Sequence, residues 1–330
     1  MKKTAPLYVM ILGIMILSIY FIYPKNEVEN RKFIAQSYIL SSESDNSFLY
    51  GYNEALISYE KAENNLKPLS ECLNSNLQKY LENEINKDPK WQSLVKNKKM
   101  AVGIVDLTDQ FNPRFASING SEMMYAASLP KIAVLLAVND AIEKKEIKET
   151  EEVKEDMRLM ISKSNNQATT RLIDLVGYDK IEEVLRDPRY HLYDEEEGGG
   201  LWVGKRYAAG GNTNREPLKH LSHAATAKQV CRFYYMLANK QLVSEERSEK
   251  MLEIMQDPEL HHKFVNTLDK IAPNAKVYRK SGSWKSWHSD SVLVMGKKRK
   301  YILVALVEDP TGEQIIRNLV VPAERAINKK

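Results

Sequence analysis

Ser128 and Lys131 are spaced as a nucleophile and its base would be. They belong to the tetrapeptide Ser-Leu-Pro-Lys, which directly precedes an apolar run at residues 132–138. Pro130 suits the first turn of a helix, and residues three apart on a helix share a face. A serine hydroxyl becomes a good nucleophile when a neighbouring base takes its proton, and burial can lower the pKa of a lysine enough to make it that base. The pattern therefore indicates acyl-transfer chemistry, although a serine helix cap followed by a surface lysine would have the same letters.

Two more short patterns of hydroxyl, amide and ammonium side chains follow. They are Ser164, Asn165 and Asn166, and later Lys280, Ser281 and Gly282. The first group opens a helical pattern at residues 167–176, and the second ends a strand-like run at residues 276–281. Singly, the first fits a helix cap and the second a strand-edge charge beside a bulge. Three ordered patterns in matching contexts are improbable by chance.

In this order the patterns resemble the S-x-x-K, S-D-N and K-T-G motifs of class A β-lactamases and penicillin-binding proteins. The resemblance extends from about residue 69 to the C-terminus. It implies an α+β fold of the β-lactamase/transpeptidase-like kind and a serine hydrolase that opens β-lactams through an acyl-enzyme. It also leaves open a penicillin-binding DD-peptidase, another amide or ester hydrolase, and a membrane-tethered sensor that stays acylated. A β-lactam or a peptidoglycan-derived peptide is the implied ligand, and no cofactor is implied.

The resemblance implies a role for each matching position. Ser128 would form the acyl-enzyme with Lys131 as its base, and Ser164 would relay a proton to the leaving nitrogen. Asn166 would bind the substrate's side-chain amide, while Lys280 and Ser281 would bind its carboxylate. Gly282 and Ser283 complete the implied substrate-binding set. The N–H groups of Ser128 and Ser283 would form the oxyanion hole.

The sequence departs from the family pattern in ways that bear on the chemistry. Asn165 replaces the usual Asp and Ser281 the usual Thr, and both keep hydrogen-bonding groups. The interval between the first two motifs is also shorter than in familiar β-lactamases. Class A enzymes release the acyl group with a loop glutamate, and no glutamate here falls fully into place, although Glu216-Pro217-Leu218 resembles part of that loop pattern late in the sequence. Glu216 and Glu197 are the candidates, and each also fits an exposed loop acid.

Hydrophobic patterning predicts an antiparallel sheet formed by both chain ends, with an all-helical region inserted between them. Leucines at 69, 73, 77 and 81 predict a helix, and a run of acids and glycines at 194–211 predicts an exposed loop. Strands are predicted at 100–107, 115–118, 276–281, 289–295 and 301–307. Helices are predicted at 132–138, 167–176, 223–238, 251–255 and 314–327.

The N-terminal segment predicts attachment to a membrane. Residues 5–23 carry no charge, follow Lys2 and Lys3, and are long enough to nearly span a bilayer as a helix. The run ends in bulky residues, which favours an uncleaved anchor over a cleaved signal segment. We therefore expect an anchor at 1–25, a polar helical connector at 26–65 and the hydrolase domain at 66–330, with that domain extracytoplasmic and monomeric.

The remaining features argue against other functions. Lys and Arg number 48 against 44 Asp and Glu, and the basic run at 297–300 reads as a hairpin turn, so we expect no nucleic-acid partner. Cys72 and Cys231 fit two buried thiols. Paired histidines lack a completing Cys or carboxylate cluster, so no metal site is expected. Trp284 and Trp287 follow the last motif and fit either a pocket wall or core packing.

Overall fold

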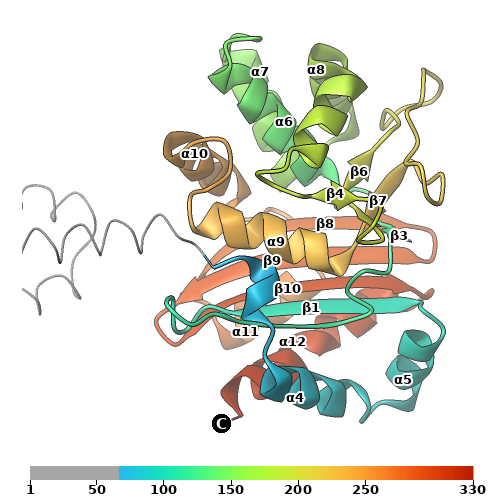
Figure 1. The fold of residues 1–330 in the computed structure, drawn as a ribbon, viewed down its shortest axis with the longest axis vertical. Helices are drawn as coiled ribbons and strands as arrows, with labels where there is room; N and C mark the ends of the chain where they lie inside the picture. The colour runs from blue at the N-terminus through green and yellow to red at the C-terminus, as the bar shows by residue number, and fades with distance from the viewer. Residues whose placement is uncertain (1–66, 330) are drawn as a thin grey trace, which may run out of the picture. The chain divides into compact units, whose positions relative to one another are not determined.

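Strands from both ends of the described chain meet in one five-stranded antiparallel sheet (Figure 1). The computed structural model describes residues 67–329, so the segments predicted at 1–25 and 26–65 lie outside the described residues. The strands stand in the order β2 (Arg114–Ile118), β1 (Met100–Asp106), β10 (Arg299–Glu308), β9 (Trp287–Gly296) and β8 (Lys276–Trp284). The predicted α+β fold is confirmed. Among the described helices, none is both long and apolar enough to cross a membrane.

The centre of the sheet is formed by β1 and β10, the strands nearest the two chain ends. Their register places Met100 opposite Val307 and Asp106 opposite Tyr301. Every residue of β1 is buried. Because helices cover both faces, this strand is apolar from Met100 to Val105, before Asp106 at its end, instead of alternating with polar residues. A continuous apolar run in the sequence is therefore what marks the middle of this sheet.

Helices from distant parts of the chain cover the two faces of the sheet (Figure 1). On one face, α4 (Ser75–Ile85), α11 (Phe264–Ile271) and α12 (Gly312–Asn328) share a hydrophobic core with the strands. On the other face, α9 (Ala227–Ala238) packs against β1, β9 and β10. The short helix α5 (Pro89–Lys96) lies beside β1. Burial on both faces accounts for the large apolar core.

The inserted helical region lies beyond α9 (Figure 1). Its helices are α6 (Lys131–Glu143), α7 (Glu151–Ser162), α8 (Asn166–Arg186) and α10 (Glu245–Met255). Two small sheets join it to the rest. One has three strands in the order β3 (Met124–Tyr125), β7 (His223–Ala225) and β6 (Trp202–Val203), and the other pairs β4 (Tyr193–Asp194) with β5 (Gly199–Gly200). Residues 131–142 of α6 are all buried, which agrees with the uniformly apolar run in the sequence.

The predicted helix with leucines every fourth residue is two elements. A 3₁₀ helix, η1 (Leu69–Cys72), ends before Leu73, whose side chain is 65% exposed. Asn74 then caps α4 by accepting a hydrogen bond of 2.9 Å from the backbone N–H of Leu77. A new cap restarts the helical register, so the four-residue spacing crosses a boundary.

Two other predicted elements differ from the structure. The helix predicted at 223–238 begins only after Thr226, whose side chain caps α9, because residues 223–225 pair as β7 with β3 and β6. The predicted exposed loop at 194–211 contains a buried stretch at 199–204, which supplies β5 and β6. Tertiary pairing decides both cases.

The helix predicted at 167–176 ends as expected. Gly177, with φ of +79° and ψ of +161°, leaves the helical region, so α8 consists of two helical segments that meet at this residue.

Candidate active site

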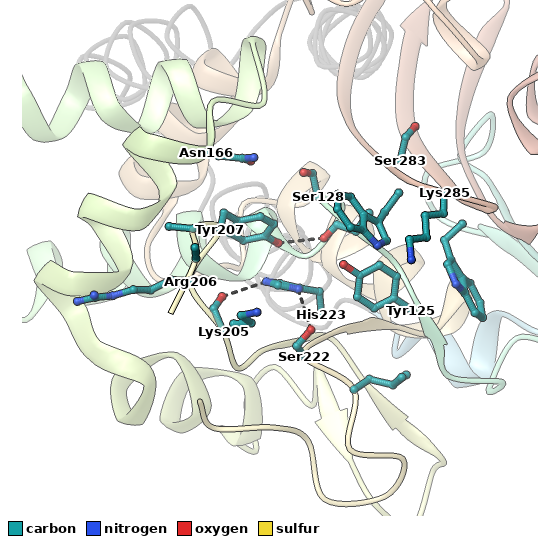
Figure 2. Close-up of a pocket in the computed structure, with 16 residues that line it drawn as sticks. Tyr125, Ser128, Asn166, Lys205, Arg206, Tyr207, Ser222, His223, Ser283 and Lys285 are labelled. Atoms are coloured by element: carbon teal, nitrogen blue, oxygen red, sulfur yellow. Dashed lines mark hydrogen bonds between the residues drawn. The ribbon is translucent and has the colours of Figure 1, made fainter. Parts of the chain in front are cut away.

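Ser128 lies in a tight turn between β3 and α6. The preceding residue, Ala127, has φ of +50°, in the left-handed region that non-glycine residues seldom adopt. The Leu129 N–H then donates to the Ala126 carbonyl at 3.0 Å, and the Lys131 N–H to the Ser128 carbonyl at 3.3 Å, so the turn winds directly into α6. The half-buried Ser128 side chain is thereby presented to a cleft (Figure 2).

Lys131, the first residue of α6, is completely buried and held by the turn between α7 and α8. Its Nζ donates to the Ser164 carbonyl at 2.7 Å and to Asn166 Oδ1 at 2.8 Å. Within the described chain the hydrogen bonds of this Nζ go to residues 164–166, and none goes to Ser128. Burial lowers the pKa of Lys131 to about 7. A neutral amine, able to accept a proton, is therefore accessible near neutral pH.

The Ser164 hydroxyl lies between two buried lysines. Ser164 has φ of +55° and occupies the turn before α8. Its Oγ lies 3.5 Å from Lys131 Nζ and accepts a hydrogen bond of 2.9 Å from Lys280 Nζ. Burial, together with the nearby Lys131, holds the pKa of Lys280 well below its usual value. The hydroxyl is thus placed to pass protons between groups whose pKa values are both depressed.

Gly282 allows β8 to pass directly against the turn that carries Ser128. A Cβ at this position would lie 2.3 Å from the Ala126 carbonyl oxygen and 2.5 Å from the Ser128 backbone N. Any side chain would therefore push the strand and the turn apart. Ser281 is buried beside it, whereas Ser283 lines the cleft together with Ser128. The close approach places the backbone of β8 beside the Ser128 N–H.

The cleft has a volume of about 790 Å³ and a lining that is aromatic and cationic (Figure 2). Asn166 and Ser283 line it with Ser128, whereas Lys131, Ser164 and Lys280 lie behind it as a connected network. No Asp or Glu lines this cleft within the part of the chain that the structure describes. The aromatic and basic lining residues are Tyr125, Lys205, Arg206, Tyr207, His223, Trp284, Lys285 and Trp287.

Tyr207 and His223 form one wall of the cleft next to Tyr125 (Figure 2). The Tyr207 hydroxyl donates to the Ala127 carbonyl at 3.0 Å, and its ring centroid lies 4.5 Å from Lys131 Nζ. The His223 Nε2 lies 3.0 Å from the Lys205 carbonyl, and its Nδ1 lies 3.1 Å from the Ser222 hydroxyl. Burial lowers the pKa of His223 to about 4, so its ring is neutral at pH 7.

The structure does not bring the two candidate glutamates to the cleft. Glu216 is completely buried and, contrary to an exposed loop acid, organises its own loop. Its carboxylate accepts hydrogen bonds from the backbone N–H groups of 218, 219 and 221 at 2.7–2.8 Å. Glu197 accepts from Lys228 at 2.8 Å and from the amide of Gln229 at 3.2 Å. Both carboxylates are engaged in structural contacts.

The residues after the last motif lie partly in the cleft and partly in the core. Trp284, 58% exposed, and Trp287 line the cleft, and the Trp287 ring lies 6.1 Å from that of Tyr125 in an edge-on arrangement. Asp290 instead forms a buried ion pair with Arg279 at 2.7 Å. In residues 67–329, no group of three or more His, Cys, Asp or Glu side chains could hold a metal ion.

Sequence reasoning missed Tyr207 and His223 as parts of this site. No local pattern marks either residue, because each reaches the cleft through the path of the chain between α8 and α9. Within the described residues just after Tyr207, the sequence offers one signal of a sharp turn, the glycine pair Gly210 and Gly211. Both have positive φ in the structure.

Comparison with known proteins relates this arrangement to a family. The model of the beta-lactamase enzyme family matches residues 77–158 and 150–329. Comparison with curated protein sequences gives no significant match.

Solved structures share the fold at low identity. The β-lactamase from Sphaerobacter thermophilus DSM 20745 is 17% identical with a TM-score of 0.60, over 76% of this chain and 97% of its own. A mutant of PBP-A, solved as an acyl-enzyme complex with penicillin-G, is 18% identical with a TM-score of 0.58, over 78% and 98%. A class A β-lactamase representative from Bacteroides cellulosilyticus DSM 14838 is 19% identical with a TM-score of 0.57, over 78% and 100%.

Proposed function

Because the chain belongs to the beta-lactamase enzyme family, we propose that its domain opens β-lactams through an ester on Ser128. The observation that carries this proposal is the network behind the nucleophile. Lys131, with a pKa of about 7, and Lys280 both contact the Ser164 hydroxyl, and the turn that presents Ser128 leads directly into Lys131. This arrangement supports roles for Ser128 as nucleophile, Lys131 as base and Ser164 as proton relay.

The acylation step follows from this placement. Neutral Lys131 takes the Ser128 proton while Oγ forms a bond to the lactam carbonyl carbon. The C–N bond then breaks, and the nitrogen receives a proton through Ser164, which recovers one from Lys131. Backbone N–H groups of Ser128 and Ser283 would stabilise the negative oxygen of the intermediate. The step requires a small rotation that brings the Ser128 hydroxyl and Lys131 Nζ within hydrogen-bonding distance.

The charges of the cleft favour an anionic substrate. Lys205 and Lys285 line it, and Arg206 lines it while pairing with Asp174. Carboxylates are missing from the described lining, so the field attracts negative ligands. A β-lactam carboxylate or the carboxylate of a peptidoglycan-derived peptide meets this requirement. The aromatic walls suit an apolar acyl side chain beside that carboxylate.

A second candidate is a penicillin-binding role in which the ester persists. The observation that favours it is the aromatic cover on Lys131, because Tyr207 places a ring there and no carboxylate of the described lining could act as a base for hydrolysis of the ester. Glu216 and Glu197 are engaged elsewhere. The related PBP-A was trapped, as a mutant, in an acyl-enzyme complex with penicillin-G. Slow release of the β-lactam acyl group would turn the same acylation chemistry into a receptor for β-lactams.

One experiment separates these functions. The purified protein is incubated with a chromogenic cephalosporin while absorbance and intact mass are followed together. Multiple turnovers support hydrolysis, and a single burst with a stable mass increase supports the penicillin-binding role. Ser128→Ala should abolish both signals, while Ser162→Ala, which changes a hydroxyl bonded to the Arg158 carbonyl of α7, should change neither. No reaction of the wild-type protein would refute β-lactam chemistry.

We also propose that residues 1–25 anchor this domain on the outer side of a membrane. The support is the uncharged segment at 5–23 and the lysines before it. N-terminal sequencing of the mature protein tests the proposal. A start at residue 1 or 2 together with membrane fractionation is expected, and a start beyond residue 23 would contradict it.

A further inference from the structure

Lys263 is a fully buried lysine that the acylation chemistry above does not use. It directly precedes α11, has φ of +55°, and does not line the cleft. Its Nζ donates to the Gly282 carbonyl at 2.5 Å, to the Ser283 hydroxyl at 2.8 Å and to the Ser289 carbonyl at 2.9 Å. An ammonium group has three N–H donors, and three acceptors surround it here. The arrangement therefore matches the charged form of the side chain.

The first of these acceptors belongs to the peptide unit that joins Gly282 to Ser283, and Ser283 lines the cleft together with Ser128. Gly282 and Ser289 stand opposite each other in the β8–β9 ladder. Lys263 Nζ contacts the carbonyl oxygens of both Gly282 and Ser289. These two carbonyls therefore point toward each other between the strands, as in a hydrogen-bonded antiparallel pair. The next residue, Ser283, then turns its N–H outward from β8, which is the edge strand of the sheet. The carbonyl and the N–H of this trans peptide point in opposite directions.

Ser128 lies directly beside this peptide. A Cβ on Gly282 would lie 2.5 Å from the Ser128 backbone N, so the two chains are in contact there. Ser128 and Ser283 line the same cleft. A cation bonded to the carbonyl end of an amide withdraws electrons through the conjugated C–N bond and makes the N–H end a stronger donor. Lys263 also fixes the position of the donor by holding three groups of the hairpin.

The charges around Lys263 keep a cation in place despite burial. Asp290 of β9 and Glu313 of α12 raise the pKa of Lys263, whereas Arg279 of β8, which pairs with Asp290, lowers it. The neighbouring His262, His288 and Lys280 add positive charge only when protonated, and burial lowers the pKa of each. Burial lowers the pKa of Lys263 to about 8, so the charged form prevails at pH 7.

We propose that Lys263 is a positioning residue for the oxyanion hole, which polarises the Gly282–Ser283 peptide from behind so that the Ser283 N–H binds the developing oxyanion more strongly. This inference rests on the proposed acylation of Ser128. The site thus contains a third buried lysine besides Lys131 and Lys280. This lysine acts without touching the substrate. A purely structural role would hold the hairpin but leave the acyl carbonyl unchanged.

The test compares Lys263→Met, Lys263→Gln and the matched control Lys180→Met. Lys180 is also buried and paired, with Asp140 at 2.6 Å, but it lies at α8 away from the cleft. Stopped-flow acylation by a penicillin and the infrared stretching frequency of the ester carbonyl in the adduct are measured for each variant. We expect Lys263→Met to slow acylation by about 10-fold, less than the ~100-fold or more that loss of a direct oxyanion donor costs. We expect its ester carbonyl to absorb at higher frequency, with Lys263→Gln between it and the wild type.

A measurement on the unmodified protein guards against misfolded variants. The amide ¹H and ¹⁵N shifts of Ser283 are followed by NMR from pH 6 to pH 10, and we expect them to move with a midpoint near 8 as Lys263 loses its proton. Unchanged Ser283 shifts, or a Lys263→Met adduct with wild-type rate and carbonyl frequency, would overturn the inference while leaving Ser128 chemistry intact. Failure of the wild-type protein to acylate refutes the proposed function instead, and the NMR titration still decides whether Lys263 polarises the peptide.

Discussion

The Tyr207 ring covers Lys131, with 4.5 Å between the ring centroid and Nζ. The Tyr207 hydroxyl is bonded to the Ala127 carbonyl, so the ring is fixed to the turn that carries Ser128. An aromatic face stabilises a cation and offers no base. In the proposed mechanism, Tyr207 therefore influences both Lys131, the base that forms the ester, and the water that would hydrolyse the ester.

Replacing Tyr207 by glutamate should speed release of the acyl group. A carboxylate at this position could activate water, and a well-placed general base contributes ~100-fold or more. We expect at least a 10-fold shorter adduct half-life, measured by intact mass after removal of free penicillin. Acylation at pH 7 should slow, because an adjacent carboxylate raises the pKa of Lys131. Tyr207→Gln, which is similar in size to glutamate but not a base, should keep a long-lived adduct, and equal half-lives for Glu and Gln would contradict the argument.

The acylation rate should rise with pH through a midpoint near 7. Burial lowers the pKa of Lys131 to about 7, and only its neutral form accepts the Ser128 proton, so the active fraction grows as pH increases. Its neighbours Ser164, Asn166 and Tyr207 carry no carboxylate that would raise this pKa. Second-order acylation constants measured from pH 5 to pH 10 test this.

His223 is not the source of that midpoint. Burial lowers its pKa to about 4, so it stays neutral across this range. Above pH 8 the rate should fall again as Lys263 loses its proton. A flat profile, or a single rise with a midpoint near 10, would show that Lys131 is not the base.

Gly282→Ala should reduce acylation by about 100-fold or more. The new Cβ would press on the Ala126 carbonyl and the Ser128 N–H, and a misplacement of about 1 Å in a catalytic group can cost that much. Gly296 is the last residue of β9, far along the strand from the residue that faces Gly282. A Cβ there would meet only the Ala275 side chain closely, so Gly296→Ala should keep its acylation rate. Stopped-flow acylation with circular dichroism as a folding check distinguishes the two. Similar rates for both variants would mean that the close approach at 282 is not needed.

Asp290→Ala should destabilise the domain strongly. Its carboxylate accepts from Arg279 Nε at 2.7 Å and from the Phe264 N–H at 3.1 Å, with both charged side chains almost completely buried. Loss of one partner from a buried ion pair costs ~3–5 kcal/mol because the other charge is left uncompensated. Glu308→Gln, in an exposed pair with Lys99, should cost ~1 kcal/mol or less. Urea unfolding gives both values, and equal losses would contradict the assignment.

The fold was predictable from the sequence where local patterns carry it. The apolar runs that became β1 and α6 are buried on all sides, and the three motifs fix the order of the parts. By contrast, β7 is three residues long and exists only because it pairs with β3 and β6. Its His223 therefore could not be told from a helical residue by pattern alone.

The candidate site shows the same division. Ser128, Lys131, Ser164 and Lys280 belong to short motifs whose spacing is visible in the chain, and the structure brings them into one network. Their individual roles stay predictions. Lys263 carries no such signal, since its contacts arise only where the residue before α11 meets the β8–β9 hairpin. Interactions made by tertiary packing leave no periodic trace in the sequence.

The most direct test of the central claim is to locate a penicillin adduct on the chain. The protein is incubated with benzylpenicillin, quenched, digested and mapped by tandem mass spectrometry, with Ser128→Ala treated in parallel. We predict a single modified residue, Ser128, and no adduct in the variant. An adduct on another residue, or an unmodified Ser128 in a protein that still consumes β-lactams, would contradict the account.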